Sequence, residues 1–173
     1  MFAVVVIGPP GSGKTTVLTA LHDELVDGDV AHAVIEVEAI AWGHPNPTDE
    51  QSFRHLETLC RMYESAGREL ILVGATATSA GYLTAVIAAI GAEDRLVVRL
   101  EADPATMRGR VREREPAEWS GLDELVSRID GIALASRALE AVDLVCSTEN
   151  TSAFAVAQRI RRTRPDILGD AAS

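Results

Sequence analysis

The chain has 173 residues and a formal net charge of -10, and 47% of its residues are hydrophobic. This length favours a single domain over residues 1–173, and this hydrophobic content excludes a chain that is disordered throughout. The negative charge argues against a nucleic acid partner, because affinity for nucleic acid depends on basic side chains that neutralise phosphates. No apolar run has the length of a membrane span, and the two cysteines lie far apart, so we expect a cytoplasmic protein with no membrane partner.

Apolar runs alternate with helical patterns along the chain. The runs rich in β-branched residues predict strands at 2–7, 32–38, 69–75, 95–101 and 142–147. The segments between them predict helices at 14–26, 49–66, 79–90, 104–115, 121–140 and 151–163. Repeated strand–helix units of this kind predict an α/β sandwich in which helices cover both faces of a parallel sheet. The last segment, 164–173, is expected to be a frayed tail.

A glycine-rich turn separates the first predicted strand from the first predicted helix. Its sequence GPPGSGKT, from Gly8 to Thr15, matches the P-loop pattern G-x-x-x-x-G-K-[ST] in the context that the pattern requires. The glycines allow backbone N–H groups to point at phosphate oxygens, and the helix that follows adds the positive end of its dipole. Thr15 offers a hydroxyl to Mg²⁺. We therefore predict a site for a nucleoside triphosphate and Mg²⁺ that is formed by Gly8, Pro9, Pro10, Gly11, Ser12, Gly13, Lys14, Thr15 and Thr16.

Lys14 is the one lysine of the chain, and the other fifteen basic residues are arginines. A lysine is a flexible point charge that can reach between the β- and γ-phosphates of a nucleotide. The planar fork of an arginine replaces it poorly there. The distribution of basic residues therefore supports a phosphate-binding and catalytic role for Lys14.

A cluster of arginines follows the fourth predicted strand. In the run EADPATMRGRVRERE, residues 101–115, Arg110 and Arg114 are four residues apart and so lie on one face of a helix. Together with the glycine loop, this run resembles the P-loop small-molecule kinases, which include adenylate, shikimate, gluconate and adenylylsulfate kinases and chloramphenicol phosphotransferase. The resemblance implies a five-stranded sheet of order 2-3-1-4-5, a short lid at 115–121, and ATP-dependent phosphorylation of a small hydroxylated molecule.

The same resemblance implies roles for the two arginines. The first, Arg110, would lie over the adenine, and the second, Arg114, would reach the phosphates from the lid and stabilise charge during transfer. The turn 147–150 would border the adenine. We interpret Arg108 and Arg112 as members of surface ion pairs. Arg128 and Arg137, on the helix that returns from the lid, could add a further contact.

Phosphoryl transfer to a hydroxyl requires a carboxylate that orients or deprotonates the acceptor. Many of the kinases named above have D-x-D at the end of the second strand or an Asp at the end of the third. Here the third predicted strand ends at Gly74, whereas the second contains Glu36 and Glu38, two residues apart and so on one side of a strand. We assign Glu38 as the acceptor base and Glu36 as the partner of Mg²⁺. The alternative is that both are solubilising charges on an edge strand.

The segment 39–54 follows the second predicted strand, where the resemblance places the acceptor pocket. Adenylate-kinase-like enzymes have an arginine after the third strand that binds the phosphate of the acceptor, and no arginine occurs here between that strand and Arg95. This favours a neutral hydroxylated acceptor over a nucleotide, although Arg54 could still bind a phosphate. Trp42 fits a packing role as well as a binding role. The predicted acceptor residues are Trp42, His44, Arg54, Thr76 and Tyr82.

Two other functions are compatible with a glycine loop. One is a P-loop ATP-binding or ATPase module that acts on a partner protein. A GTPase would need an [NT]KxD motif, for which no second lysine exists, and an AAA-type motor would need room for a helical lid domain. The other is a polynucleotide kinase, which the acidic balance disfavours. The sequence thus predicts an ATP-dependent phosphotransferase that acts on a small molecule.

Overall fold

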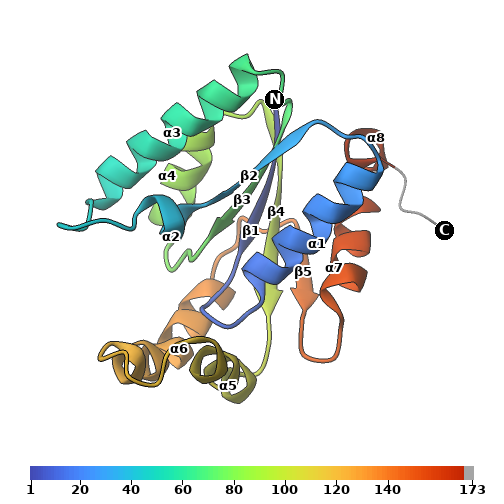
Figure 1. Cartoon of the computed structure of the whole chain (residues 1–173). Coiled ribbons are helices and arrows are strands. Elements are labelled where there is room, and N and C mark those ends of the chain that lie inside the picture. The colour runs from blue at the N-terminus through green and yellow to red at the C-terminus, as the bar shows by residue number, and fades with distance from the viewer. Residues whose placement is uncertain (170–173) are drawn as a thin grey trace.

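A five-stranded parallel sheet forms the centre of the computed structural model, which describes residues 1–169 (Figure 1). Neighbouring strands pair in parallel, and their order is β2-β3-β1-β4-β5, as predicted. The strands are β1 (Phe2–Ile7), β2 (His32–Glu36), β3 (Leu70–Ala75), β4 (Asp94–Glu101) and β5 (Leu144–Ser147). The predicted α/β fold class is therefore confirmed.

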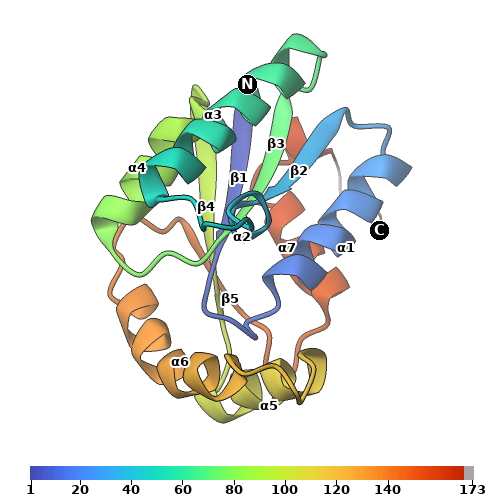
Figure 2. The ribbon, with the colours of Figure 1, turned by 60° about the vertical axis from the view of Figure 1, so that its left-hand side comes forward.

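Helices lie on both faces of this sheet (Figures 1 and 2). One face is covered by α1 (Lys14–Asp27), α7 (Ala153–Arg161) and the short α8 (Pro165–Leu168). The other is covered by α3 (Asp49–Ser65) and α4 (Ala80–Ile90). Two more helices, α5 (Pro104–Arg114) and α6 (Leu122–Arg137), pack on each other beyond the carboxyl end of β4. No helix within residues 1–169 is long and apolar enough to cross a membrane.

The central strand β1 shows how the sequence produces these layers. All six of its residues are apolar and buried. Phe2, Val4 and Val6 belong to the core beneath α1 and α7, whereas Ala3, Val5 and Ile7 belong to the core beneath α3 and α4. Because side chains alternate across a strand, a continuous apolar run supplies both cores.

The carboxyl ends of the parallel strands lie at one edge of the sheet, and the glycine loop follows β1 there. Glu36 at the end of β2 pairs with Gly74, and Ile7 at the end of β1 pairs with Ala75. A short helix, α2 (Val37–Ile40), follows β2 at the same edge. Figure 2 shows α2 on one side of this edge and the pair α5–α6 on the other. The fold thus brings the ends of β2 and β3, the helix α2 and the pair α5–α6 around the glycine loop.

Two predicted segments are wrong. The second strand ends at Glu36 and not at residue 38, because pairing with β3 stops there and Val37 turns into the core as the first residue of α2. The tail is not frayed over residues 165–168, because Leu168 is fully buried and its carbonyl oxygen accepts a hydrogen bond of 3.0 Å from Arg161 Nε. Residues 170–173 of the predicted tail lie outside the described residues. The other predicted boundaries agree with the structure to within three residues.

Candidate active site

The glycine loop is held in a shape that only glycine permits at its centre. Gly11 and Gly13 have φ angles of 78° and 92°, in the left-handed region. A Cβ atom on Gly11 would lie 2.4 Å from the carbonyl oxygen of Met107 in α5, so the glycine loop and α5 are in close contact. Ser12 is buried, and its Oγ has no hydrogen-bond partner in the described part of the chain. The loop is therefore a tight turn whose backbone amides can face an anion.

Lys14 begins α1 and folds back over the loop. Its Nζ donates hydrogen bonds to the carbonyl oxygens of Gly8 (2.9 Å) and Pro9 (3.3 Å) and to Thr76 Oγ1 (3.0 Å). Burial lowers the pKa of this ammonium group, while the nearby carboxylates of Glu38 and Glu36 act in the opposite direction. The lysine is thus oriented by three oxygen atoms from two segments of the chain.

Glu36 reaches from β2 to the start of α1. Its Oε2 accepts a hydrogen bond of 2.9 Å from Thr15 Oγ1. Gly74 of β3 lies beside it, and a Cβ atom there would be 2.7 Å from Leu18 Cδ1 and 3.5 Å from Glu36 Cγ. The missing side chain on β3 leaves the room that Glu36 occupies, and the long Glu side chain spans the distance to Thr15.

The pair formed by Thr15 and Glu36 has the chemistry of a magnesium site. A hydroxyl and a carboxylate oxygen lie 2.9 Å apart at the mouth of the glycine loop. Mg²⁺ prefers oxygen ligands, and in nucleotide sites it takes one or two carboxylates and leaves its other positions to phosphates and water. No group of three or more His, Cys, Asp or Glu residues forms a metal cluster within residues 1–169. The donor set therefore fits a nucleotide-bound Mg²⁺ and not a closed protein cage.

Glu38 lies on α2 and not on a strand, so the prediction that it shares a strand face with Glu36 is wrong. The helical turn of α2 nevertheless directs its carboxylate to the same edge of the sheet, where its Oε1 accepts a hydrogen bond of 2.6 Å from the backbone N–H of Thr76. Thr76 therefore contacts Glu38 through its amide and Lys14 through its hydroxyl. No sequence pattern indicates this link, because Lys14, Glu38 and Thr76 are far apart in the chain.

Arg110 ties the glycine loop to the loop after β5. Its guanidinium donates to the carbonyl oxygen of Gly11 (3.2 Å), to Thr148 Oγ1 (3.0 Å) and to the carbonyl oxygen of Thr148 (2.7 Å). Thr148 Oγ1 in turn donates to the carbonyl oxygen of Ser12 at 3.0 Å. A cavity of about 220 Å³ adjoins this junction. Its lining residues are Gly13, Thr16, Val17, Arg110, Thr148, Thr151 and Ala153.

The loop after β5 also holds the start of α5. Glu149 accepts hydrogen bonds from Thr106 Oγ1 (2.6 Å) and from the backbone N–H of Asp103 (2.8 Å). These two donors lower the pKa of the Glu149 carboxyl, with that of Thr106 having the larger effect. The position of α5 relative to the glycine loop is therefore fixed at both Arg110 and Glu149.

Arg114, at the end of α5, is bound to its neighbour. Its Nη2 lies 2.5 Å from Glu115 Oε1, and its side chain is largely exposed. Arg108 pairs instead with Asp130 of α6, as expected for a structural ion pair. Arg110 therefore faces the glycine loop, whereas Arg108 joins α5 to α6.

These groups surround one cavity of about 610 Å³, a size typical of sites for small molecules. It is lined by seven of the predicted loop residues, both predicted arginines, both predicted glutamates and Thr76. Glu113 and Leu125 also line it and were missed, although Glu113 lies three residues after Arg110 and so shares its helix face. The lining residues are Pro9, Pro10, Gly11, Gly13, Lys14, Thr15, Thr16, Glu36, Glu38, Thr76, Arg110, Glu113, Arg114 and Leu125.

Four predicted acceptor residues do not line this cavity. Trp42 is 91% exposed, so the alternative that it packs in the core is wrong. His44 lies in the exposed loop after α2, and Arg54 lies 3.8 Å from Glu50 in an exposed ion pair. Tyr82 stacks edge-on against the ring of Phe53, 5.2 Å between centroids. A role for these residues in acceptor binding stays a prediction.

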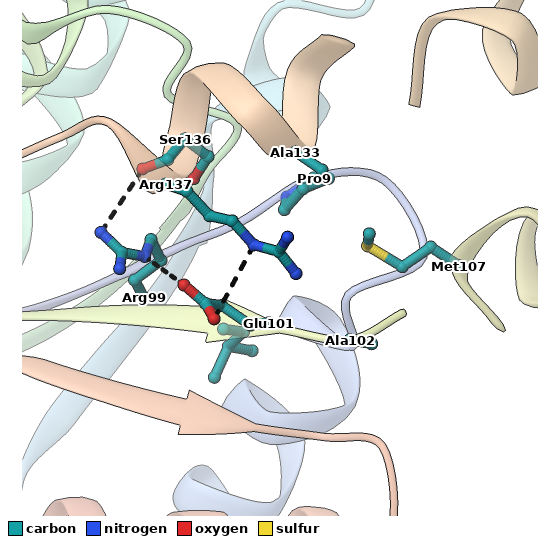
Figure 3. Close-up of a pocket in the computed structure, with 9 residues that line it drawn as sticks. Pro9, Arg99, Glu101, Ala102, Met107, Ala133, Ser136 and Arg137 are labelled. Atoms are coloured by element: carbon teal, nitrogen blue, oxygen red, sulfur yellow. Dashed lines mark hydrogen bonds and ion pairs between the residues drawn. The ribbon is translucent and has the colours of Figure 1, made fainter. Parts of the chain in front are cut away.

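A third, much smaller cavity lies behind the glycine loop (Figure 3). Its volume of about 10 Å³ has room for about one water molecule and excludes a substrate. Arg99 Nε donates to Glu101 Oε1 at 2.8 Å, and Arg137 Nε lies 3.9 Å from Glu101 Oε2. Arg137 therefore fastens α6 to β4 and does not face the large cavity, and Arg128 forms an exposed pair with Glu124.

Comparisons with known proteins agree with this geometry. A family model described as an AAA domain matches residues 4–130. A protein of Schizosaccharomyces pombe named "Probable gluconokinase" is 39% identical over 59 residues, which are 31% of this chain and 31% of that relative. The chain thus aligns with about a third of the length of this curated relative.

Solved structures extend the likeness to the whole chain. An unliganded sugar kinase from Janibacter sp. HTCC2649 has a TM-score of 0.67 at 21% identity and covers 100% of this chain and 99% of its own. The APS kinase of Mycobacterium tuberculosis, in complex with AMPPNP and APS, has a TM-score of 0.69 at 18% identity, with 92% and 95% covered. At these identities the structures show the fold. Because the family model spans most of the chain, the protein belongs to the family described as an AAA domain, and its fold is that of the solved sugar kinase and APS kinase.

Proposed function

We propose that the protein transfers the γ-phosphoryl group of ATP to a hydroxyl of a small molecule. One observation supports this most: Lys14 of the glycine loop and the carboxylate of Glu38 face one cavity and are joined through Thr76. Glu38 forms no ion pair within the described residues, so its carboxylate is available to a substrate hydroxyl. The AMPPNP in the APS kinase complex supports an ATP-type nucleotide.

The nucleotide would occupy the end of the cavity formed by the glycine loop. The loop amides, the N-terminus of α1 and Lys14 would bind the β- and γ-phosphates. The cavity of about 220 Å³ beside Thr148 would take the adenosine, with Arg110 as its outer wall. Arg114 would exchange Glu115 for the phosphates when the lid, residues 115–121, closes.

Thr15 and Glu36 would hold Mg²⁺. The ion would neutralise phosphate charge as the nucleotide reacts. Glu36 also keeps the hydroxyl of Thr15 directed at the mouth of the loop, since the two are joined by a hydrogen bond of 2.9 Å. This places a carboxylate next to the phosphates while leaving Glu38 to the acceptor.

Transfer is a single displacement at the γ-phosphorus. The acceptor hydroxyl gives its proton to Glu38, and its oxygen forms a bond to phosphorus while the bond from phosphorus to the β–γ bridging oxygen breaks. ADP leaves with that electron pair, and the products are ADP, the phosphate ester and one proton. Lys14 and Arg114 would stabilise the negative charge that develops on the transferred group.

The cellular compartment of the protein is proposed from its two cysteines. Cys60 and Cys146 are buried and unpaired, and burial raises the pKa of the Cys60 thiol to about 11. Such thiols are inert and suit a reducing compartment, so we propose that the protein works in the cytoplasm.

Acceptor-dependent ADP release tests the function. The protein is incubated with Mg-ATP alone and with pools of hydroxylated metabolites and antibiotics, and ADP and phosphorylated products are measured. A pool that raises ADP release and yields a phosphate ester supports a small-molecule kinase. ADP release that no acceptor pool raises and that only a partner protein raises would identify an ATPase module instead.

A further inference from the structure

Phosphate binding at the start of α1 depends on the direction of one peptide group. The first N–H groups of an α-helix have no partner within the helix, and α1 begins at Lys14 with Gly13 as its N-cap and no side chain that caps it. The amide of Gly13 can therefore bind a phosphate if it points into the large cavity, which Gly13 lines. If this peptide were turned over, the carbonyl oxygen of Ser12 would face the phosphate instead, because the C=O and N–H of a trans peptide point in opposite directions.

The glycine itself does not fix this direction. Gly13 has a φ angle of 92°, and glycine adopts positive and negative φ angles about equally well. The peptide between Ser12 and Gly13 can therefore turn over at little cost to Gly13. A contact from outside the loop has to hold it in the orientation that suits an anion.

Thr148, in the loop after β5, makes that contact. Its Oγ1 donates a hydrogen bond of 3.0 Å to the carbonyl oxygen of Ser12, and no other hydrogen bond to this oxygen occurs within residues 1–169. The side chain is buried against the loop, since a Cβ atom on Gly13 would lie 3.8 Å from Thr148 Cγ2. Thr148 does not line the large cavity, so the C=O of Ser12 points away from that cavity and the N–H of Gly13 points towards it.

The neighbours of Thr148 leave its hydroxyl proton to Ser12. A threonine hydroxyl has one proton to donate, and Arg110 Nη1 is a donor to Oγ1 at 3.0 Å, so this contact does not use the proton. The carbonyl oxygen of Glu101 lies farther from Oγ1, at 3.4 Å, and already accepts the backbone N–H of Thr148 at 2.8 Å. The backbone bond therefore fixes Thr148 to the end of β4, and the hydroxyl fixes the glycine loop to Thr148.

We propose that Thr148 is a positioning residue, which directs the amide of Gly13 at the phosphates of the nucleotide through its hydrogen bond to Ser12. The inference rests on one part of the proposed function, the binding of phosphates by the glycine loop, and does not depend on the acceptor. Thr148 also lines the cavity of about 220 Å³ that is proposed for the adenosine. The inference predicts that its hydroxyl supports binding of the phosphate chain and not of the base.

Calorimetric titration with two Mg²⁺-bound probes tests the inference. The probes are AMPPNP and inorganic tripolyphosphate, which has no base. Thr148→Val keeps the shape of the side chain and removes the hydroxyl, so it should lower the affinity for both probes about tenfold, whereas Thr148→Ser should stay within about twofold of the native protein. A loss confined to AMPPNP would assign Thr148 to the base and overturn the inference, as would equal losses in the valine and serine variants.

Thr106→Val is the matched control. It removes a hydroxyl that donates to Glu149 at 2.6 Å in the same junction between α5 and the loop after β5, and this hydroxyl forms no hydrogen bond to the glycine loop in the described part of the chain. We expect it to change the affinity for either probe by less than about twofold, because the peptide of Gly13 keeps its anchor. A loss as large as that of Thr148→Val would reveal a general loosening of the junction and overturn the inference.

The direction of the amide can be measured by NMR. The chain has two Ser–Gly pairs, Ser12–Gly13 and Ser120–Gly121. Cell-free synthesis with carbonyl-¹³C serine and ¹⁵N glycine therefore gives two amide signals that are selected by the labelled carbonyl, and Ser120→Ala identifies them by removing one. In the native protein, Mg-AMPPNP should shift the amide proton of Gly13 downfield, as a hydrogen bond to phosphate does.

In Thr148→Val this shift should be lost, while an unchanged Gly121 signal in the free variant shows that the chain is folded. An unshifted Gly13 signal in native protein that binds Mg-AMPPNP would overturn the inference and leave the kinase standing. Native protein that binds neither probe would overturn the proposed function, and the inference with it.

Discussion

The two ends of the cavity are built in different ways. The phosphate end comes from one continuous segment, residues 8–16, whose glycines, lysine and threonine each have a fixed place in a known pattern. The end proposed for the acceptor is assembled from separate segments, with Glu38 on α2 and Thr76 after β3. The chemistry of a continuous segment can be predicted from the sequence pattern. The chemistry of a wall that several segments form can be predicted only when the strand register and the turns between elements are known.

The two ends also differ in how firmly they are held. Arg110 donates hydrogen bonds to Gly11 and Thr148, Thr148 donates to Ser12, and Glu149 holds the start of α5. At the acceptor end, one backbone N–H, that of Thr76, holds the carboxylate of Glu38. We therefore expect changes at the phosphate end to abolish activity and changes at the acceptor end to alter it by degrees.

The largest effect is expected at Lys14. Lys14→Ala removes the ammonium group that binds the phosphates and should lower kcat/KM about 10³-fold and abolish thermal stabilisation by Mg-AMPPNP. Lys14→Arg keeps the charge but should lose most activity too, because a planar guanidinium cannot replace the bonds of Nζ to Gly8, Pro9 and Thr76. Kinetics and differential scanning fluorimetry measure both. Full stabilisation of the alanine variant would contradict the assignment of the loop.

Next in size is the change at Glu38. Glu38→Gln should lower kcat about 10²-fold while nucleotide binding persists, since the amide cannot accept the proton of the acceptor. The matched variant is Glu36→Gln, which should raise the Mg²⁺ concentration needed for half-maximal activity, because Glu36 is bonded to Thr15. Single-turnover transfer and Mg²⁺ titration separate the two. An active Glu38→Gln beside a dead Glu36→Gln would reverse the roles.

A smaller effect is expected at Thr76, which joins the two ends. Thr76→Val removes the hydroxyl that accepts from Lys14 but keeps the amide that binds Glu38, so kcat should fall about tenfold with little change in either KM. Thr76→Ser restores the hydroxyl and should recover most of the activity. If the serine and valine variants are equally impaired, the hydroxyl is not the link.

The smallest effect is a dependence of nucleotide affinity on alkaline pH. Burial puts the pKa of Lys14 below its usual 10.5 in the free protein, whereas bound phosphates favour the ammonium form. Affinity for Mg-AMPPNP should thus be constant below the lowered pKa and fall as pH rises through it, by at most about tenfold per pH unit. Calorimetric titration of Mg-AMPPNP from pH 7 to 10 measures this dependence. A flat profile in the native protein would argue against a lowered pKa.

The sequence predicted the fold because its signals are local. The apolar runs of β1 and β3 and the glycine loop each suffice to place an element, and the resemblance supplied the strand order. The end of β2 could not be predicted, since Glu36 and Glu38 alternate as in a strand and only the loss of pairing after Gly74 ends it. The burial of Leu168 was hidden for a similar reason, because it depends on contacts with Arg161 and the core beneath α1.

At the site, residues that belong to a local sequence pattern were predicted, and residues that depend on contacts between distant segments were not. Lys14, Thr15 and the glycines follow from a motif, and Arg110 and Arg114 follow from the resemblance of their run to the P-loop small-molecule kinases. Glu113 was missed because a glutamate among arginines is typical of a solvated helix. The link through Thr76 depends on distances between β3, α1 and α2 that no linear pattern encodes.

Gly74 restricts where the chain can carry an acidic group. An aspartate there would place a Cβ atom 2.7 Å from Leu18 Cδ1, inside a packed core. Leu18 would have to shift or to become smaller, and a smaller residue at this buried position would lower stability. The bare position on β3 thus favours carboxylates that come from β2 and α2.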